Sequence, residues 1–335
     1  MKKTLLTICL VWMCFSLSAQ KIIDLSGKWS FSIDRQDNGE KEKWFSHTLN
    51  DFINLPGSMP EKLKGDEVTA KTQWTGSLYD SSYYYNPYME KYRKEGNIKF
   101  PFFLTPDKHY VGAAWYQKEV NIPADWKGER ILLFLERPHI ETTVWVNGQK
   151  TGMQNSLCVP HQYDITRYVR PGKCTITIRV DNRIKEINVG PDSHSITDQT
   201  QGNWNGIVGR ICLQTTPKTY FDDIQIYPEP EQKLARVKVV IKGTGTAKVK
   251  LSAESFNTDK KHIVPAIQQE IKLNKGVTET EMVLPMGNDM LLWDEFHPAL
   301  YKLKAEVTNG KKTEIKEIQF GIRRFEIKGK WFYVN

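Results

Sequence analysis

The chain has 335 residues, of which 39% are hydrophobic and 26% charged, and its formal net charge is +8. This length exceeds the roughly 100–200 residues of one typical domain, so the composition predicts two globular domains. The positive charge is spread through alternating lysines such as Lys238, Lys242, Lys248 and Lys250. That spacing is typical of a solvated sheet face, and it argues against a nucleic-acid-binding surface.

The first nineteen residues have the features of a secretory signal peptide. Lys2 and Lys3 precede an apolar stretch from Leu5 to Leu17, and small residues around Ala19 form a cleavage zone. The apolar stretch is shorter than the roughly 17–25 residues that span a bilayer. We therefore predict a signal peptide at residues 1–19, secretion or periplasmic export, and no membrane span. The cysteines left after cleavage are Cys158, Cys174 and Cys212, an odd number that disfavours a disulfide framework.

Apolar residues alternate with period two through most of residues 20–218. Leu25–Ile33 and Cys174–Val180 show this pattern, and Ile131–Leu135 is a short continuous apolar run typical of a buried strand. Thr142–Val146 leads into Asn147-Gly148, a strong hairpin signal. We predict an all-β fold that begins with a jelly-roll sandwich. The long tyrosine-rich connection from Glu61 to Tyr110 is predicted to be a functional loop.

A second sandwich is predicted at residues 219–320, because short alternating runs recur there at the spacing of an immunoglobulin-like domain. The predicted strands are Ile224–Tyr227, Val237–Ile241, Ala247–Ser252, Val277–Leu284, Tyr301–Val307 and Thr313–Phe320. The segment Gly243-Thr244-Gly245 is interpreted as a turn between two of them. After Phe320 the sequence predicts one more strand, a turn at Lys328-Gly329 and a final apolar strand at Trp331–Val334, loosely held after about Arg324.

The sequence lacks the motifs of several other chemistries. It contains no HExxH run and no G-x-S-x-G elbow, and its seven histidines are scattered. We therefore expect neither a metal site nor a cofactor. Glu136, His139 and Glu141 form a polar cluster beside Pro138, which we interpret as a strand connection rather than an acid–base group. Trp29, Trp115 and Trp145 lie on predicted strands, where a role in the core is favoured over a sugar-stacking platform.

A series of short motifs resembles the N-terminal half of glycoside hydrolase family 2, the β-galactosidase, β-glucuronidase and β-mannosidase group. In chain order they are Leu25–Trp29, Leu55–Ser58, Ala114–Lys118, Val144–Gly148, Tyr163–Thr166 with Pro171-Gly172, Val180–Asn182, Asn203–Ile207, Leu292-Trp293 with Pro298, Leu300 and Tyr301, and Phe320–Arg323. The resemblance implies a galactose-binding-like jelly roll, an immunoglobulin-like domain, and a short start of a catalytic (β/α)₈ barrel at residues 321–335.

The resemblance also implies hydrolysis of O-glycosyl bonds in carbohydrates. Retaining hydrolysis needs two carboxyl groups about 5–5.5 Å apart. No residue of this chain maps onto either role, so we expect no catalytic residue here and an inactive chain. The expected partners are β-linked glycosides, the barrel domain of a full-length parent, and other copies in a homo-oligomer. The alternative is a stand-alone carbohydrate-binding protein with an aromatic platform at Tyr79–Tyr92.

One polar loop, Ser193–Gly206, is the candidate substrate-binding segment. The residues predicted to contact substrate are Asp198, Gln199, Asn203 and Trp204. Carboxylate and amide groups of this kind bind sugar hydroxyls, and an indole ring stacks on a sugar face. By resemblance, such a loop reaches toward the active site and carries an acidic residue, for which Asp198 is the best match. The alternative is a solvated loop held by its own Asx turns.

Overall fold

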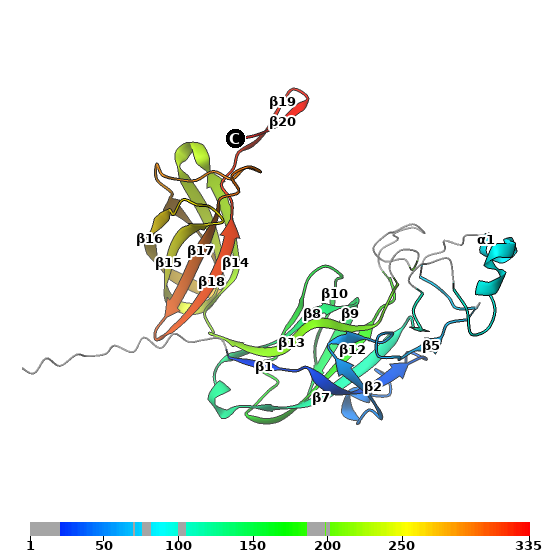
Figure 1. Ribbon diagram of the computed structural model, residues 1–335. Helices are drawn as coiled ribbons and strands as arrows, with labels where there is room; N and C mark the ends of the chain where they lie inside the picture. The colour runs from blue at the N-terminus through cyan, green and yellow to red at the C-terminus, as the bar shows by residue number, and fades with distance from the viewer. Residues whose placement is uncertain (1–20, 70, 76–81, 100–104, 186–197, 199–201) are drawn as a thin grey trace, which may run out of the picture. The chain divides into compact units, whose positions relative to one another are not determined.

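A computed structural model describes residues 21–69, 71–75, 82–99, 105–185, 198 and 202–335. The chain forms two compact units, Lys21–Thr215 and Thr216–Asn335. Both are built almost wholly of antiparallel strands (Figure 1). The predicted all-β fold, a jelly-roll sandwich followed by an immunoglobulin-like sandwich, is confirmed.

The first unit contains two large antiparallel sheets. One has the order β1-β13-β8-β11, with β4 also paired to β13, and the other has the order β10-β9-β12-β7-β2-β3. The strands of the first sheet are β1 Ile22–Asp24, β4 Gly57–Ser58, β8 Arg130–Pro138, β11 His161–Asp164 and β13 Gly206–Thr216. Those of the second are β2 Gly27–Asp34, β3 Asp51–Leu55, β7 Ala113–Ile122, β9 Glu141–Val146, β10 Gln149–Asn155 and β12 Gly172–Asp181.

The main core of the first unit is formed by one face of each strand. Along β12, Cys174, Ile176, Ile178 and Val180 are all buried in this core, as the alternation predicts. On β2, Trp29 and Phe31 belong to the same core. The period of two therefore places apolar side chains on the face where burial stabilises the sandwich.

The opposite face of the second sheet is also buried, because a segment between β2 and β3 covers it. Trp115 and Trp145 pack there with Leu49, and the partly buried Trp44 and Phe45 lie against them. The rings of Phe45 and Trp145 stack with centroids 5.2 Å apart. The 3₁₀ helix η1, Trp44–Ser46, carries both covering aromatics. Trp29, Trp115 and Trp145 are thus core residues, which confirms that interpretation over a sugar platform.

The strand β9 turns into β10 through Asn147 and Gly148, as predicted. Their φ angles are 50° and 77°, the left-handed values that a type I′ hairpin turn requires. The apolar run Ile131–Leu135 is buried within β8, also as predicted.

The long connection after Glu61 has little regular structure. It contains β5 Asp66–Glu67 paired with β6 Lys108–His109, the short helix α1 Ser82–Tyr85, and the 3₁₀ helix η2 Pro87–Tyr92. Tyr83 is fully buried, whereas Tyr85 and Tyr88 are 72% and 85% exposed. Tyr79 lies outside the described residues. A further 3₁₀ helix of the first unit is η3 Ala124–Trp126.

The second unit is built from strands that are longer than the predicted ones and that begin and end at other residues. They are β14 Tyr220–Glu229, β15 Leu234–Phe256, β16 Ile263–Pro285, β17 Leu300–Asn309 and β18 Lys312–Phe320, with the 3₁₀ helix η4 Pro230–Gln232 between β14 and β15. The predicted turn at Gly243–Gly245 is instead a register shift inside β15. The first half of β15 pairs with β14 and the second half with β17, so a bulge changes the strand's partner without ending it.

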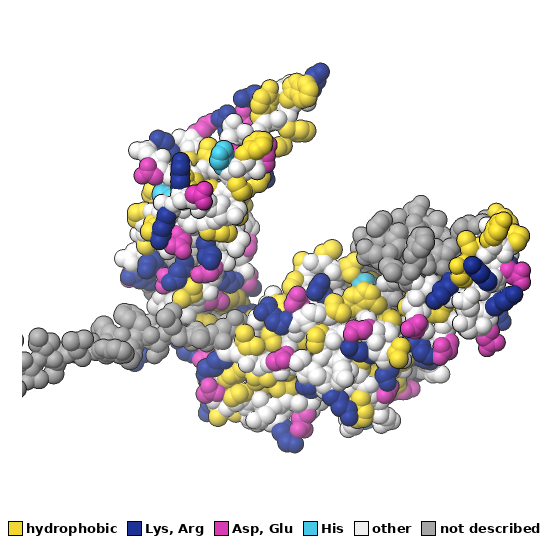
Figure 2. All heavy atoms as spheres, in the orientation of Figure 1, with side chains coloured by type: hydrophobic (Ala, Val, Ile, Leu, Met, Phe, Trp, Pro, Cys, Tyr) yellow, Lys and Arg dark blue, Asp and Glu magenta, His cyan; other side chains and the backbone are white. Residues whose placement is uncertain are grey.

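A terminal hairpin follows the second sandwich. β19 Phe325–Lys328 pairs with β20 Trp331–Val334, and Figure 1 shows the hairpin projecting from the end of its unit. Its side chains form an exposed apolar patch (Figure 2), with Trp331 61% and Phe332 70% exposed. By contrast, Ile322 is fully buried in the core of the sandwich. The packed unit therefore extends two residues beyond Phe320.

The described cysteines are free thiols. Cys174 and Cys212 are buried, as predicted, and Cys158 is exposed. Burial raises the pKa of the Cys174 thiol to about 11, which makes it unreactive at neutral pH. No helix within the described ranges is long and apolar enough to cross a membrane.

Candidate functional site

The candidate substrate-binding loop joins the end of β12 to the start of β13. The structure describes Asp198, Asn203 and Trp204 of this loop, whereas Gln199 lies outside the described residues. Asp198 and Asn203 are each 3% exposed, and the Asp198 carboxylate accepts a hydrogen bond from the Asn203 backbone N–H. Trp204 is partly buried. The structure therefore brings two of the four predicted residues together in one hydrogen-bonded cluster.

Asp198 fastens the loop to the long connection of the first unit. Its backbone N–H donates to the carbonyl of Thr75 at 2.9 Å, and its carboxylate accepts from the Thr75 N–H at 2.5 Å. The other carboxylate oxygen accepts from the backbone N–H of Asn203. Burial raises the pKa of Asp198, opposed by these backbone hydrogen bonds. Both carboxylate oxygens are thus engaged in holding two segments 123 residues apart.

Asn203 connects the same loop to the end of β12. Its amide donates to the Thr75 hydroxyl at 2.8 Å and to the carbonyl of Asn182 at 3.0 Å, and its Oδ1 accepts from Asn182 Nδ2 at 3.1 Å. Asn182 in turn donates to the carbonyl of Tyr110 and accepts from the N–H of Gly112, both at 2.8 Å. These hydrogen bonds between amide groups fix the described end of the loop against Tyr110 and Gly112, which directly precede strand β7.

Asn205, which the sequence analysis did not select as a site residue, is also held by three side-chain hydrogen bonds. It is fully buried, accepts from the Tyr116 hydroxyl at 2.7 Å, and donates to the carbonyls of Gly112 and Val180, both at 2.9 Å. The sequence did contain a signal for Asn182 and Asn205, because each adjoins an apolar strand. A side-chain amide is buried at such a position only if it is hydrogen-bonded.

Trp204 lies against a buried histidine. Its ring stacks on His139 with centroids 4.5 Å apart and an interplanar angle of 30°. Burial lowers the pKa of His139 to about 4, opposed by the nearby Asn203 side chain. The imidazole is therefore neutral at physiological pH and forms a flat support behind the indole. His139 lies in the connection between β8 and β9. The carboxylate of Glu136 accepts from the Arg210 backbone N–H at 2.8 Å. The polar cluster beside Pro138 is therefore a strand connection, as interpreted.

A buried ionic network, not anticipated from the sequence, lies at the end of β12. Arg179 contacts Asp37 at 2.6 Å, Asp181 at 3.0 Å and Glu141 at 3.4 Å. Asp181 is fully buried and also binds Arg183. Burial alone would raise the pKa of Asp181, but hydrogen bonds from Arg183 and Lys185 outweigh it and hold this pKa far below its usual range. These carboxylates are charge partners, and none is positioned as a proton donor.

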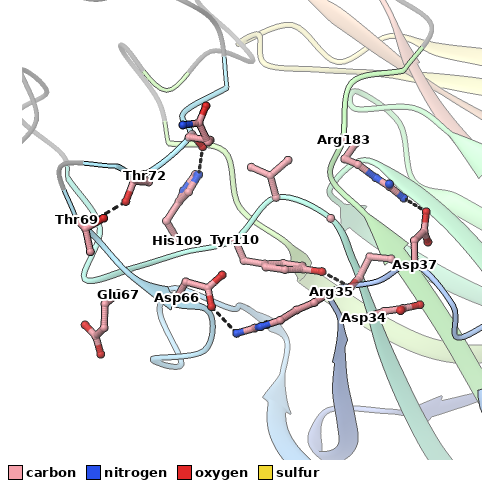
Figure 3. Close-up of a pocket in the computed structure, with 14 residues that line it drawn as sticks. Asp34, Arg35, Asp37, Asp66, Glu67, Thr69, Thr72, His109, Tyr110 and Arg183 are labelled. Atoms are coloured by element: carbon pink, nitrogen blue, oxygen red, sulfur yellow. Dashed lines mark hydrogen bonds and ion pairs between the residues drawn. The ribbon is translucent and has the colours of Figure 1, made fainter.

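A cleft of about 490 Å³ opens beside the loop's anchor points (Figure 3). It is mostly polar, and its lining combines residues that follow β2 with residues around β5, β6 and the start of β7. The lining residues are Asp34, Arg35, Asp37, Asp66, Glu67, Thr69, Thr72, Gln73, His109, Tyr110, Val111, Gly112, Ala113 and Arg183. Within the described part of the chain, no three His, Cys, Asp or Glu side chains are grouped so as to hold a metal ion.

Comparison with known proteins identifies both units. The model of the glycosyl hydrolases family 2 sugar binding domain matches residues 22–217, and a second model, described as glycosyl hydrolases family 2, matches residues 219–323. Among curated proteins, a β-glucuronidase of Paenibacillus borealis is 24% identical over 94% of this chain and 48% of its own length. A β-galactosidase of Clostridium acetobutylicum is 25% identical over 92% of this chain and 32% of its own length.

Solved structures show the same fold. A β-glucuronidase of an uncultured Clostridium species has a TM-score of 0.62 at 22% identity, over 95% of this chain and 47% of that one. The β-glucuronidase of Ruminococcus gnavus has a TM-score of 0.61 at 19% identity, over 94% and 46%. The chain spans about half the length, or less, of these relatives. Since family models match most of its residues, the chain belongs to glycosyl hydrolase family 2.

Proposed function

We propose that this chain is the sugar-binding and immunoglobulin-like portion of an exported β-glycosidase that hydrolyses O-glycosyl bonds, and that the chain itself is catalytically inactive. The observation that carries the proposal is the order of the two family models, which follow one another over residues 22–323. Relatives named as β-glucuronidases and β-galactosidases are about twice as long or longer. The catalytic (β/α)₈ barrel of the parent enzyme is the partner that this proposal assigns to the two sandwiches.

Four carboxylates of the cleft and the loop support an inactive chain. Retaining hydrolysis needs one carboxylate free to attack and one carboxylic acid free to donate a proton. In the cleft, Asp34 accepts from the Trp115 indole at 2.9 Å, Asp37 pairs with Arg179 at 2.6 Å, and Asp66 pairs with Arg35. Asp198 is closed off by two backbone donors. Each of these groups already has a structural partner.

Within this proposal, the roles of the loop residues differ. Asp198 and Asn203 position the loop, because their polar atoms are bound within the protein. Trp204, which is only partly buried and is supported by His139, is the residue that we assign to a sugar ring. Gln199 is assigned to substrate hydroxyls on its chemistry alone.

The test of the proposed function is an activity assay on the purified chain. Nitrophenyl β-galactoside, β-glucuronide and β-mannoside are incubated with the chain, and a full-length β-glucuronidase serves as the positive control. We expect no release of nitrophenol above the buffer rate. Turnover that scales with the concentration of chain would overturn the inactive assignment. Export is tested separately by expressing the precursor with its leader and sequencing the N-terminus of the exported protein, which should begin at Gln20.

A further inference from the structure

The terminal hairpin of β19 and β20 has one face made only of apolar side chains. In its register Phe325 lies opposite Val334 and Ile327 opposite Phe332, and residues two apart on a strand share a face. The rings of Phe325 and Phe332 stack on this face with centroids 5.4 Å apart. The four side chains, in chain order, are 57%, 68%, 70% and 37% exposed. We call this surface the apolar face, and much of it is in solvent.

The opposite face of the same hairpin carries charges. Glu326 lies opposite Tyr333, and Lys328 lies opposite Trp331. The Lys328 ammonium group pairs with Glu326 at 2.9 Å and lies 5.2 Å from the centre of the Tyr333 ring. A second cation, Lys330, lies 5.2 Å from the centre of the Trp331 ring. Each aromatic ring of this charged face thus has a cation over it, so the charged face is suited to water and the apolar face is not.

A hairpin of this size is at best marginally stable by itself. Among the described strands, β19 and β20 form a sheet of their own, with four residues in each strand. The base of the hairpin is tied to the sandwich, where the Asn335 side chain donates to the carbonyl of Trp293 at 2.9 Å. Two strands without a covered hydrophobic face lack the stability of a larger sheet, and burial of the apolar face would supply it.

The area of the apolar face distinguishes between two occupants. With about 200 Å² for each fully exposed side chain of this size, the four exposed fractions leave about 450 Å² of apolar surface. Two copies packed face to face would bury about 900 Å², which is below the roughly 1,200–2,000 Å² of stable interfaces. A domain joined to the hairpin by the same chain needs no such area, because its effective concentration is about millimolar. The area therefore favours a domain in the same chain over a second copy.

The family comparison provides such a domain. The second family model ends at residue 323, just before the hairpin, and the chain covers 48% of the Paenibacillus borealis β-glucuronidase. About half of that relative therefore lies outside the match. The catalytic (β/α)₈ barrel of the proposed parent enzyme is a domain of this size.

We propose that the apolar face of the terminal hairpin is the docking surface for the catalytic barrel, and that the charged face of the hairpin stays in water. The inference rests on the proposed function for the identity of the docked domain. The barrel presents an apolar surface to Ile327 and Phe332, and its docking completes the folding of the hairpin. The charged face, with Glu326 and Lys328, keeps its ion pair at the outer surface of the enzyme.

The test compares the chain of 335 residues with the protein expressed from its gene together with all coding sequence that continues past Asn335. Hydrogen exchange of the backbone amides of residues 325–334 is measured by mass spectrometry in both proteins. Phe332→Asp and Ile327→Asp each place a charge on the apolar face. Tyr333→Asp is the matched control, because it places the same charge on the next residue of β20 but on the charged face, beside Lys328.

We expect the hairpin amides to exchange at least about 100-fold more slowly in the longer protein than in the chain of 335 residues. Phe332→Asp and Ile327→Asp should remove this protection, whereas Tyr333→Asp should leave it in place. Equal exchange in the two proteins, protection that Phe332→Asp and Ile327→Asp both leave intact, or a coding sequence that stops at Asn335 would each overturn the proposal.

Sedimentation of the chain of 335 residues tests the other occupant of the apolar face. We expect a monomer, and a dimer that Phe332→Asp dissociates would assign the face to a second copy and overturn the proposal. The readouts are amide exchange and molecular mass, so they are independent of the nitrophenyl assays. Turnover by the chain of 335 residues would refute only its inactivity, whereas a barrel that leaves the hairpin unprotected would refute only the docking surface.

Discussion

Replacing Asn205 with alanine should destabilise the first unit more than any surface substitution. The change leaves the Tyr116 hydroxyl and the carbonyls of Gly112 and Val180 without their side-chain partner. Burial raises the pKa of Tyr116 well above its usual value, so its hydroxyl stays protonated and needs an acceptor. A buried polar group left unpaired costs about 1–3 kcal/mol, and the two carbonyls keep part of their bonding, so we expect a loss of about 3–5 kcal/mol.

The assay is urea unfolding followed by tryptophan fluorescence. Seven of the ten tryptophans lie between residues 21 and 215, so the signal reports mainly on the first unit. A loss of this size corresponds to a fall in the midpoint of thermal unfolding of about 10 °C for a unit of this length. The matched control is Asn155→Ala on β10, an exposed asparagine whose loss should stay within about 0.5 kcal/mol.

A double-mutant cycle isolates the central contact. Tyr116→Phe removes only the hydroxyl, so it should cost about 1–2 kcal/mol less in the Asn205→Ala background than in the unsubstituted chain. If Asn205→Ala costs no more than Asn155→Ala and the cycle shows no coupling, the reasoning from buried hydrogen bonds is refuted.

Three further predictions concern other parts of the fold. The pKa of His139 is lowered to about 4 by burial, so the unfolded state takes up its proton first and stability should fall by about 3 kcal/mol as the pH drops from 6.5 to 4. His139→Phe should flatten this pH dependence in urea titrations, and an unchanged slope would contradict it. Gly148→Ala places a side chain at a φ of 77° and should cost about 1–2 kcal/mol in thermal unfolding, whereas a neutral effect would refute the turn assignment. Ile322→Ala should cost about 2–5 kcal/mol because the side chain is fully buried, while Phe332→Ala, at 70% exposure, should cost little; equal losses would place the hairpin within the core.

The sequence predicts the fold correctly where buried and exposed residues alternate along a single strand or where a turn motif is local. The inward face of β12, the Asn147-Gly148 hairpin and the continuous apolar run of β8 were predictable for this reason. The outward face of β12 was not, because Arg179 and Asp181 are buried only where Asp37 approaches from 142 residues away. A sequence pattern carries no information about which distant segment will cover a polar face.

The strand boundaries of the second unit were harder for a local reason. Gly243 and Gly245 have φ angles of 158° and 85°, and such glycines are equally typical of a turn and of a bulge. The strand β15 continues through them because β16 pairs along both halves. The first half of β16 was missed, since it alternates buried Ile271 and Leu273 with charged residues in a short run.

The candidate site shows the same division between local and distant determinants. The polar composition of the loop was visible in the sequence, and it led to the prediction that Asp198 contacts substrate. Its partner Thr75 lies in a connection without alternation, so nothing in the sequence indicated that the carboxylate would be bound by backbone N–H groups. Substrate contact by Asp198, Gln199, Asn203 and Trp204 stays a prediction. Trp204 is distinguished among them by its partial exposure and its contact with His139.

The amide of Asn182 joins the loop and the cleft into one rigid frame. On one side it binds Asn203 of the loop, and on the other it fixes the backbone of Tyr110 and Gly112, which line the cleft. Every link in this frame is a buried hydrogen bond. Moving one part would therefore leave buried polar groups of the other part without partners, which is energetically costly. The described end of the loop and the backbone beside the cleft are consequently held at a fixed spacing, so a change at Asn182 should disturb both.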